Sequence, residues 1–94
     1  MNPYRQNPDL ITPQIRAEYK FLCVPFIEPP PGFGCDFIIR GNPIIFVEVK
    51  DPAKADRFTT AEKRLQAFAA LIGVPYVVVT TLDEALQAAG FTVE

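Results

Sequence analysis

Two apolar segments separated by three residues constrain the fold of this chain more than any other feature. Cys35–Arg40 and Ile44–Lys50 are rich in isoleucine, valine and phenylalanine, residues that favour β-strands. Gly41-Asn42-Pro43, between them, has the composition and the length of a hairpin connection. The pattern predicts two adjacent antiparallel strands.

The alternation of side chains along these two strands fixes their register. Successive side chains of a strand point to opposite faces, and the apolar faces of paired strands have to coincide. This condition pairs Phe37 with Val47 and places Asp36 opposite Glu48 on the other face. Lys50 follows Glu48 by two residues and therefore shares that face. The register predicts two carboxylates and an ammonium group at one end of the hairpin.

The remainder of the chain reads as alternating helices and strands. Thr59 to Ile72 has a capping box, Thr59 with Glu62, and Gly73 follows as a stop signal. Its predicted apolar stripe consists of Leu65, Phe68, Ala69 and Ile72. Pro75–Thr80 is valine-rich and predicts a buried strand, and Thr81 with Glu84 opens a last helix that ends at Gly90.

The N-terminal third has weaker signals. Residues 1–12 show no periodic pattern and are expected to form an irregular arm, and Thr12-Pro13 is a good helix start. Tyr19–Ile27 is equally typical of a helix and of a strand, so we expect a short helix that runs into a strand near Phe21. Pro29-Pro30-Pro31-Gly32 ends that element.

These elements predict one α/β domain over residues 1–94. The order is helix, strand, strand, strand, helix, strand, helix, which gives a mixed sheet of about four strands flanked by helices. Met1–Leu10 lacks the apolar stretch of a signal peptide, and the apolar runs are too short to cross a bilayer, so we expect a cytoplasmic protein without membrane contacts.

The composition excludes several kinds of chemistry. The chain has no histidine, which removes Ser-His and Cys-His nucleophiles. Its two cysteines, Cys23 and Cys35, are too few for a zinc site and are interpreted as small buried hydrophobic residues. Carboxylates, lysines and a metal ion that the carboxylates bind remain as the means of catalysis.

The paired carboxylates suit a hard divalent cation. Asp36 and Glu48 repel each other unless a cation lies between them, and Mg²⁺ or Mn²⁺ prefers such oxygen ligands. Together with the carbonyl oxygen of Val49 they would hold an ion that activates water next to a phosphate. Lys50 would orient the water or stabilise developing negative charge.

The residues around this cluster resemble a known enzyme family. Gly34-Cys35-Asp36-Phe37-Ile38-Ile39 followed by Ile45-Phe46-Val47-Glu48-Val49-Lys50 is similar to the Asp…Glu-x-Lys signature of the PD-(D/E)XK nuclease superfamily. The stretch from Thr60 to Ala85 resembles its VRR-NUC branch, which includes compact stand-alone nucleases, many of them encoded by phages.

The resemblance implies a restriction-endonuclease-like core and a Mg²⁺- or Mn²⁺-dependent DNA endonuclease, active in a bacterial or phage-infected cell. Branched or single-strand-containing DNA is the expected substrate, and no small-molecule cofactor is expected. The family has a glutamine on the helix after the Glu-x-Lys strand; Glu62 stands there in this chain, with Gln66 one turn later. Glu18 is the candidate for the glutamate that the family's first helix offers.

Basic residues follow the Glu-x-Lys strand closely. They are candidates for binding the DNA backbone, although a local cluster of this size is more often a solvated face. The candidates are Lys54, Arg57, Lys63 and Arg64. The small size of the domain and the family resemblance both predict a homodimer, with the interface on the N-terminal arm and on Tyr19–Ile27.

Two other functional classes stay open. The chain is either a catalyst, or a non-catalytic module that binds nucleic acid or protein on the nuclease fold, or a domain in which Glu48 and Lys50 form a structural salt bridge. A second Glu-x-Lys, Glu18-Tyr19-Lys20, lacks an aspartate in a preceding strand and is interpreted as structural.

Overall fold

A four-stranded mixed sheet with helices on both faces forms the domain in a computed structural model, which describes residues 8–93. The helices and strands along the chain are α1 (Pro8–Phe21), β1 (Phe26–Ile27), β2 (Phe37–Ile39), β3 (Ile45–Val49), the 3-10 helix η1 (Pro52–Lys54), α2 (Thr60–Ile72), β4 (Tyr76–Val79) and α3 (Leu82–Ala88). The predicted order of elements and the α/β class are confirmed.

The sheet has the strand order β1-β2-β3-β4, with β1, β2 and β3 antiparallel and β4 parallel to β3. Phe37 pairs with Val47 and Ile39 with Ile45, so the predicted hairpin register is confirmed. The chain crosses from β3 to β4 through α2, as a parallel connection requires.

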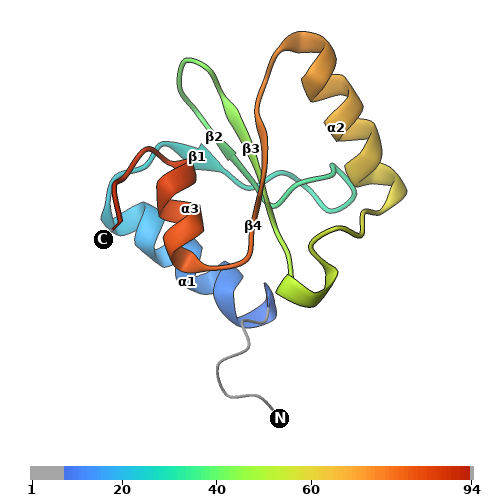
Figure 1. Cartoon of the computed structure of the whole chain (residues 1–94). Helices are drawn as coiled ribbons and strands as arrows, with labels where there is room; N and C mark the ends of the chain where they lie inside the picture. The colour runs from blue at the N-terminus through green and yellow to red at the C-terminus, as the bar shows by residue number, and fades with distance from the viewer. Residues whose placement is uncertain (1–7, 94) are drawn as a thin grey trace.

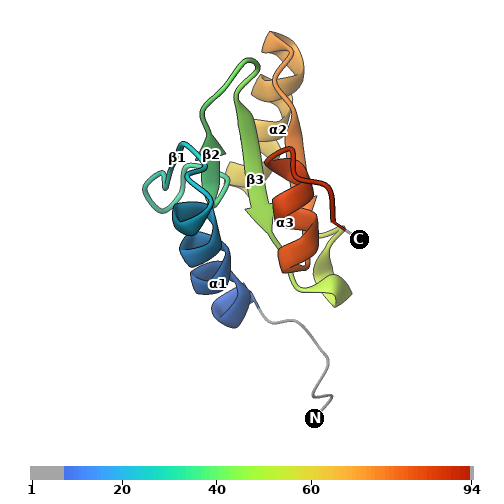
Figure 2. The ribbon, with the colours of Figure 1, turned by 90° about the vertical axis from the view of Figure 1, so that its left-hand side faces the viewer.

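The two faces of the sheet carry separate apolar clusters. Helices α1 and α3 cover one face, and α2 lies on the other (Figure 1; Figure 2 shows the same layers from the side). On the first face Tyr19 is buried against Phe37, and its hydroxyl donates to the carbonyl of Ala85, 2.6 Å away, which ties α1 to α3. The second face holds a smaller cluster of Phe46, Leu65 and Ala69.

The first helix begins earlier than predicted. Residues 8–12 are helical, whereas the sequence placed them in an irregular arm; residues 1–7 of that arm lie outside the described range. Pro8 occupies the first helical position, where its missing N–H costs nothing, and Asp9 follows in the first turn, where a carboxylate favours the helix. Burial of Ile11 and Ile15 on one face of the helix supplies the rest of the stability.

Helix α2 has the predicted ends but not the predicted burial. Its capping box is complete, and Gly73 ends it in the left-handed conformation. Leu65 and Ala69 are buried, but Phe68 is 52% and Ile72 48% exposed. The prediction was wrong for these two because the small cluster beneath α2 covers only the face on which Leu65 and Ala69 lie.

The two cysteines are both free, and they differ in burial. Cys35 is partly buried, with its thiol donating to the carbonyl of Phe37 at 3.5 Å. Cys23 is exposed, so its interpretation as a buried hydrophobic residue was wrong. No helix within residues 8–93 combines the length and the apolar character needed to cross a membrane.

Candidate active site

Asp36 is held against β3 by its backbone and by its side chain. Its N–H donates to the carbonyl of Val47 at 2.9 Å, and its Oδ2 accepts from the N–H of Val49 at 2.8 Å. Asp36 directly precedes β2, and its carboxyl group is hydrogen-bonded to that of Glu48 in β3. The structure therefore brings these two predicted residues together.

Glu48 is a charged side chain in a buried position. It lies in β3 on the α2 face of the sheet and is only 6% exposed. Burial raises the pKa of its carboxyl group to about 10, with further contributions from hydrogen bonds to Asp36 and Glu62 and from their negative charges. Without a metal ion bound, Glu48 therefore keeps its proton at neutral pH.

Lys50 lies between the carboxylates of two elements. Its Nζ is 2.5 Å from Oε1 of Glu62 and 3.5 Å from Oε2 of Glu48. Partial burial alone would lower the pKa of Lys50, but the hydrogen bond to Glu62 and the two carboxylates raise it. The lysine is therefore a held cation beside the carboxylate pair.

Glu62 was predicted as a helix cap and not as a partner of Lys50; it has both roles. Its Oε1 accepts from the N–H of Thr59 at 3.0 Å, and its own N–H donates to Oγ1 of Thr59 at 3.2 Å. Burial would raise the pKa of Glu62, but the hydrogen bonds from Glu48, Lys50 and Thr59 lower it. The cap fixes Glu62 at the start of α2, where this helix passes the end of β3.

A cavity of about 630 Å³ opens beside the carboxylates. Asp36, Glu48 and Glu62 line it together with Thr12, Arg16, Glu28, Pro29, Pro30, Pro31, Gly32, Gly34, Cys35, Thr59 and Ala61. Burial raises the pKa of the Cys35 thiol to about 12, with smaller contributions from Glu48 and Asp36, so this thiol is neutral at neutral pH. The cavity therefore presents four carboxyl groups and a neutral thiol to a ligand, and one of the four, that of Glu28, is paired with Arg16.

Gly34 brings the loop before β2 onto α2. It has φ +115°, and a Cβ atom there would lie 2.6 Å from the carbonyl oxygen of Ala61 and 2.9 Å from Cβ of Leu65. The hydroxyl of Tyr76 donates to the carbonyl of Gly34 at 2.7 Å. A glycine is required here because the contact that shapes the cavity leaves no room for a side chain.

The weaker candidates are placed in different parts of the molecule. Gln66 lies one turn after Glu62 on α2, and its buried Nε2 has no hydrogen-bond partner within the described part of the chain. Glu18 lies on α1 and lines neither this cavity nor the neighbouring one, so the structure does not bring it to the carboxylates. Lys63 and Arg64 are exposed on α2, also away from both cavities.

The donor atoms fit a hard cation with few protein ligands. Within residues 8–93 no group of three or more His, Cys, Asp or Glu side chains is arranged to hold a metal ion. Two carboxylates and a backbone carbonyl match the way Mg²⁺ is commonly bound, with water and substrate oxygen atoms completing its six ligands. Asp36, Glu48 and the carbonyl of Val49 are the residues that would hold it.

Comparison of the chain with protein-family models, with curated proteins and with solved structures finds no significant match, so the geometry of this cluster is what supports a function.

Proposed function

We propose that this chain is a metal-dependent DNA endonuclease with a restriction-endonuclease-like core. The observation that carries the proposal is the buried Glu48, whose carboxyl group is hydrogen-bonded to that of Asp36 and lies 3.5 Å from the ammonium group of Lys50. A buried carboxyl group opposite a second carboxylate is costly for a fold, and functional sites are where such costs are retained. The Asp…Glu-x-Lys order along the chain adds the resemblance to the nuclease superfamily.

The residues of the cluster divide the tasks of hydrolysis, the reaction that adds water across a P–O bond of the DNA backbone. A Mg²⁺ or Mn²⁺ ion bound by Asp36, Glu48 and the Val49 carbonyl would supply an acidic water and neutralise phosphate charge. Lys50 presents its ammonium group to the negative charge that develops on the phosphate oxygen atoms. Glu62 holds Lys50 in place, and the α2 cap holds Glu62.

The direct experiment is a cleavage assay on plasmid, linear duplex, single-stranded and forked DNA with Mg²⁺, with Mn²⁺ and with EDTA. We expect cleavage that requires the ion. Lys50→Ala should abolish cleavage and leave DNA binding largely intact, because one lysine is one contact among several. Lys20→Ala, the matched change in the second Glu-x-Lys, should retain most activity. Cleavage that persists in Lys50→Ala and fails in Lys20→Ala would contradict the assignment.

A non-catalytic binding module is the second candidate. The observation that favours it is the engagement of Lys50 by Glu62, which pairs the ammonium group that the nuclease would present to the phosphate. The two proposals differ in one respect: a binding module shifts the mobility of labelled DNA in Mg²⁺ without producing cut strands.

The proposed nuclease acts as a homodimer. The sequence placed its interface on the arm and on Tyr19–Ile27; Tyr19 is buried inside the domain and cannot contribute, whereas Phe21 is exposed. The larger exposed apolar surface lies on α2, where Leu71 is 83% exposed beside Phe68.

Light scattering tests the dimer. A mass near the 10.5 kDa of one chain would contradict it. If the mass is doubled, Leu71→Glu and Phe21→Glu, compared as a pair, identify which surface is covered, since the charge disrupts only the interface in which it lies.

A further inference from the structure

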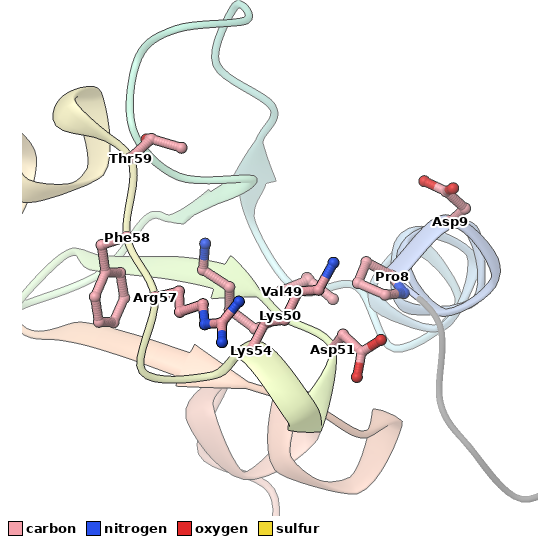
Figure 3. A pocket seen from close by; sticks show the side chains of 9 residues that line it. All are labelled: Pro8, Asp9, Val49, Lys50, Asp51, Lys54, Arg57, Phe58 and Thr59. Carbon is pink, nitrogen blue, oxygen red and sulfur yellow. The ribbon is translucent and has the colours of Figure 1, made fainter.

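A second cavity, of about 610 Å³, lies directly beside the carboxylate cluster. It is lined by Pro8, Asp9, Val49, Lys50, Asp51, Lys54, Arg57, Phe58 and Thr59 (Figure 3). Lys50 connects it with the candidate active site, because its ammonium group contacts Glu62, and Thr59 lines both cavities. A ligand that extends from the carboxylates past Lys50 enters this second cavity.

The charges of the cavity favour an anion at its centre. Lys50, Lys54 and Arg57 gather there in Figure 3, whereas Asp9 and Asp51 lie toward the start of α1. Lys54 and Arg57 are exposed, and no ion pair within residues 8–93 occupies either head group. Lys50 is paired with Glu62, so Lys54 and Arg57 are the two cations of this cavity that a phosphate can pair with.

Phe58 adds an aromatic wall to this cationic cavity. Its side chain is half-buried, and Nζ of Lys50 lies 5.3 Å from the centroid of its ring. An aromatic ring and cationic side chains in one cavity are the arrangement with which proteins bind single-stranded nucleic acid, the ring against a base and the cations against phosphates.

The segment that carries these groups is fixed before any ligand binds. The N–H of Lys54 donates to the carbonyl of Asp51 at 2.8 Å, and the N–H of Arg57 donates to the carbonyl of Lys54 at 3.0 Å. The α2 cap at Thr59 then ends the segment. The backbone of this segment is thus ordered without a ligand, and binding has to order only the exposed side chains of Lys54 and Arg57.

We infer that this cavity binds one unpaired nucleotide next to the phosphate that is cut, with its base against Phe58 and its phosphate on Lys54 and Arg57. The inference rests on the proposed function, since it assigns the DNA on one side of the cleaved bond. A base can contact a side chain with its face only when it has left the stack of a duplex. The substrate class that follows is DNA with a single-stranded segment beside the cut.

Fluorescence anisotropy in EDTA, at low salt, measures this binding without cleavage. The probes are a labelled short oligothymidine and a blunt duplex of mixed sequence. Phe58→Leu should weaken binding of the oligothymidine by about fivefold or more, the lower end of what one base–aromatic contact contributes, and should leave duplex binding unchanged. Phe58→Tyr keeps the ring and should retain the affinity, which separates the base contact from a folding defect.

Two further variants complete the test. Phe91→Leu changes a partly exposed phenylalanine outside both cavities and should bind the oligothymidine as the unmodified protein does. The double variant Lys54→Gln, Arg57→Gln should weaken binding and lower the slope of log K against log salt by roughly 1.4, the value for two single-strand phosphates.

Oligothymidine affinity that is unchanged in Phe58→Leu, or lowered there no more than duplex affinity, would overturn the inference. Because all of these measurements are made in EDTA, their result is independent of turnover. A protein that shows the Phe58 dependence but cuts no DNA would support the nucleotide site and contradict the proposed nuclease activity. A protein that cuts DNA but lacks the Phe58 dependence would keep the proposed nuclease activity and contradict the nucleotide site.

Discussion

Replacing Glu48 by glutamine should remove a dependence of folding stability on pH. The pKa of Glu48 is raised from its ordinary value near 4.5 to about 10 in the folded metal-free protein, chiefly by burial. A raised pKa means that the folded state holds the proton more tightly, so the stability from this group is full below the unfolded pKa and is lost as pH rises toward the folded one. Glu48→Gln mimics the protonated form and cannot lose it.

The magnitude follows from the interval between the two pKa values. Within that interval each pH unit changes the free energy of unfolding by up to about 1.4 kcal/mol for one group. Between roughly pH 6 and pH 8 the unmodified protein should therefore lose up to about 3 kcal/mol relative to the variant. In a domain of this size that difference lowers the melting temperature by roughly 10–20 °C.

The assay is urea unfolding in EDTA, followed by circular dichroism at a series of pH values. Glu48→Gln should become more stable than the unmodified protein as pH rises, and the gap should close at low pH. Glu18→Gln is the matched control in the second Glu-x-Lys and should keep the unmodified dependence on pH. Parallel stability curves for the unmodified protein and Glu48→Gln would refute the reasoning, because they would mean that Glu48 is charged in the fold or accessible to water.

Two predictions concern the surroundings of the cluster. Glu62→Gln should lower the rate of cleavage at least about tenfold, as the loss of a positioning contact does, and rescue by Glu62→Asp would argue against positioning by the longer side chain. The measurement is the single-turnover rate with Mg²⁺ over a pH series. The variant should lose this rate at a lower pH than the unmodified enzyme, because the Lys50 cation has lost a partner. Gly34→Ala should lower the free energy of unfolding by about 1–3 kcal/mol more than Gly32→Ala, because both glycines have positive φ but only at Gly34 would the new Cβ meet the Ala61 carbonyl; equal urea midpoints for the two variants would contradict this.

The hairpin and its register could be predicted from the sequence because two independent constraints agree. Alternating apolar residues on both strands admit few registers, and a three-residue connection selects the one that pairs Phe37 with Val47. That register also predicted that the side chains of Asp36 and Glu48 lie close together, and they are hydrogen-bonded in the structure. The ends of α2 were predictable for the same reason, since Thr59, Glu62 and Gly73 each fix a backbone group.

Other features depend on contacts that a linear pattern does not contain. The start of α1 was missed because Pro8 and Thr12-Pro13 are both acceptable helix starts, and only the burial of Ile11 decides between them. The exposure of Phe68 depends on how small the cluster beneath α2 is. The contact between Glu62 and Lys50 joins two elements whose relative placement the sequence left open. The signal that could have predicted it is a capping glutamate in the first turn of the helix that follows the Glu-x-Lys strand.

Calorimetric titration with Mn²⁺ at pH 8 tests most directly the central claim that Asp36 and Glu48 form a metal site. The unmodified protein should bind one ion per chain, and titrations in buffers of different ionisation enthalpy should show release of about one proton, because the ion displaces the proton held by Glu48. Asp36→Asn, whose amide oxygen can still accept from the N–H of Val49, should bind the ion at least about tenfold more weakly. Equal Mn²⁺ affinity in the two proteins, or binding without proton release, would contradict the account.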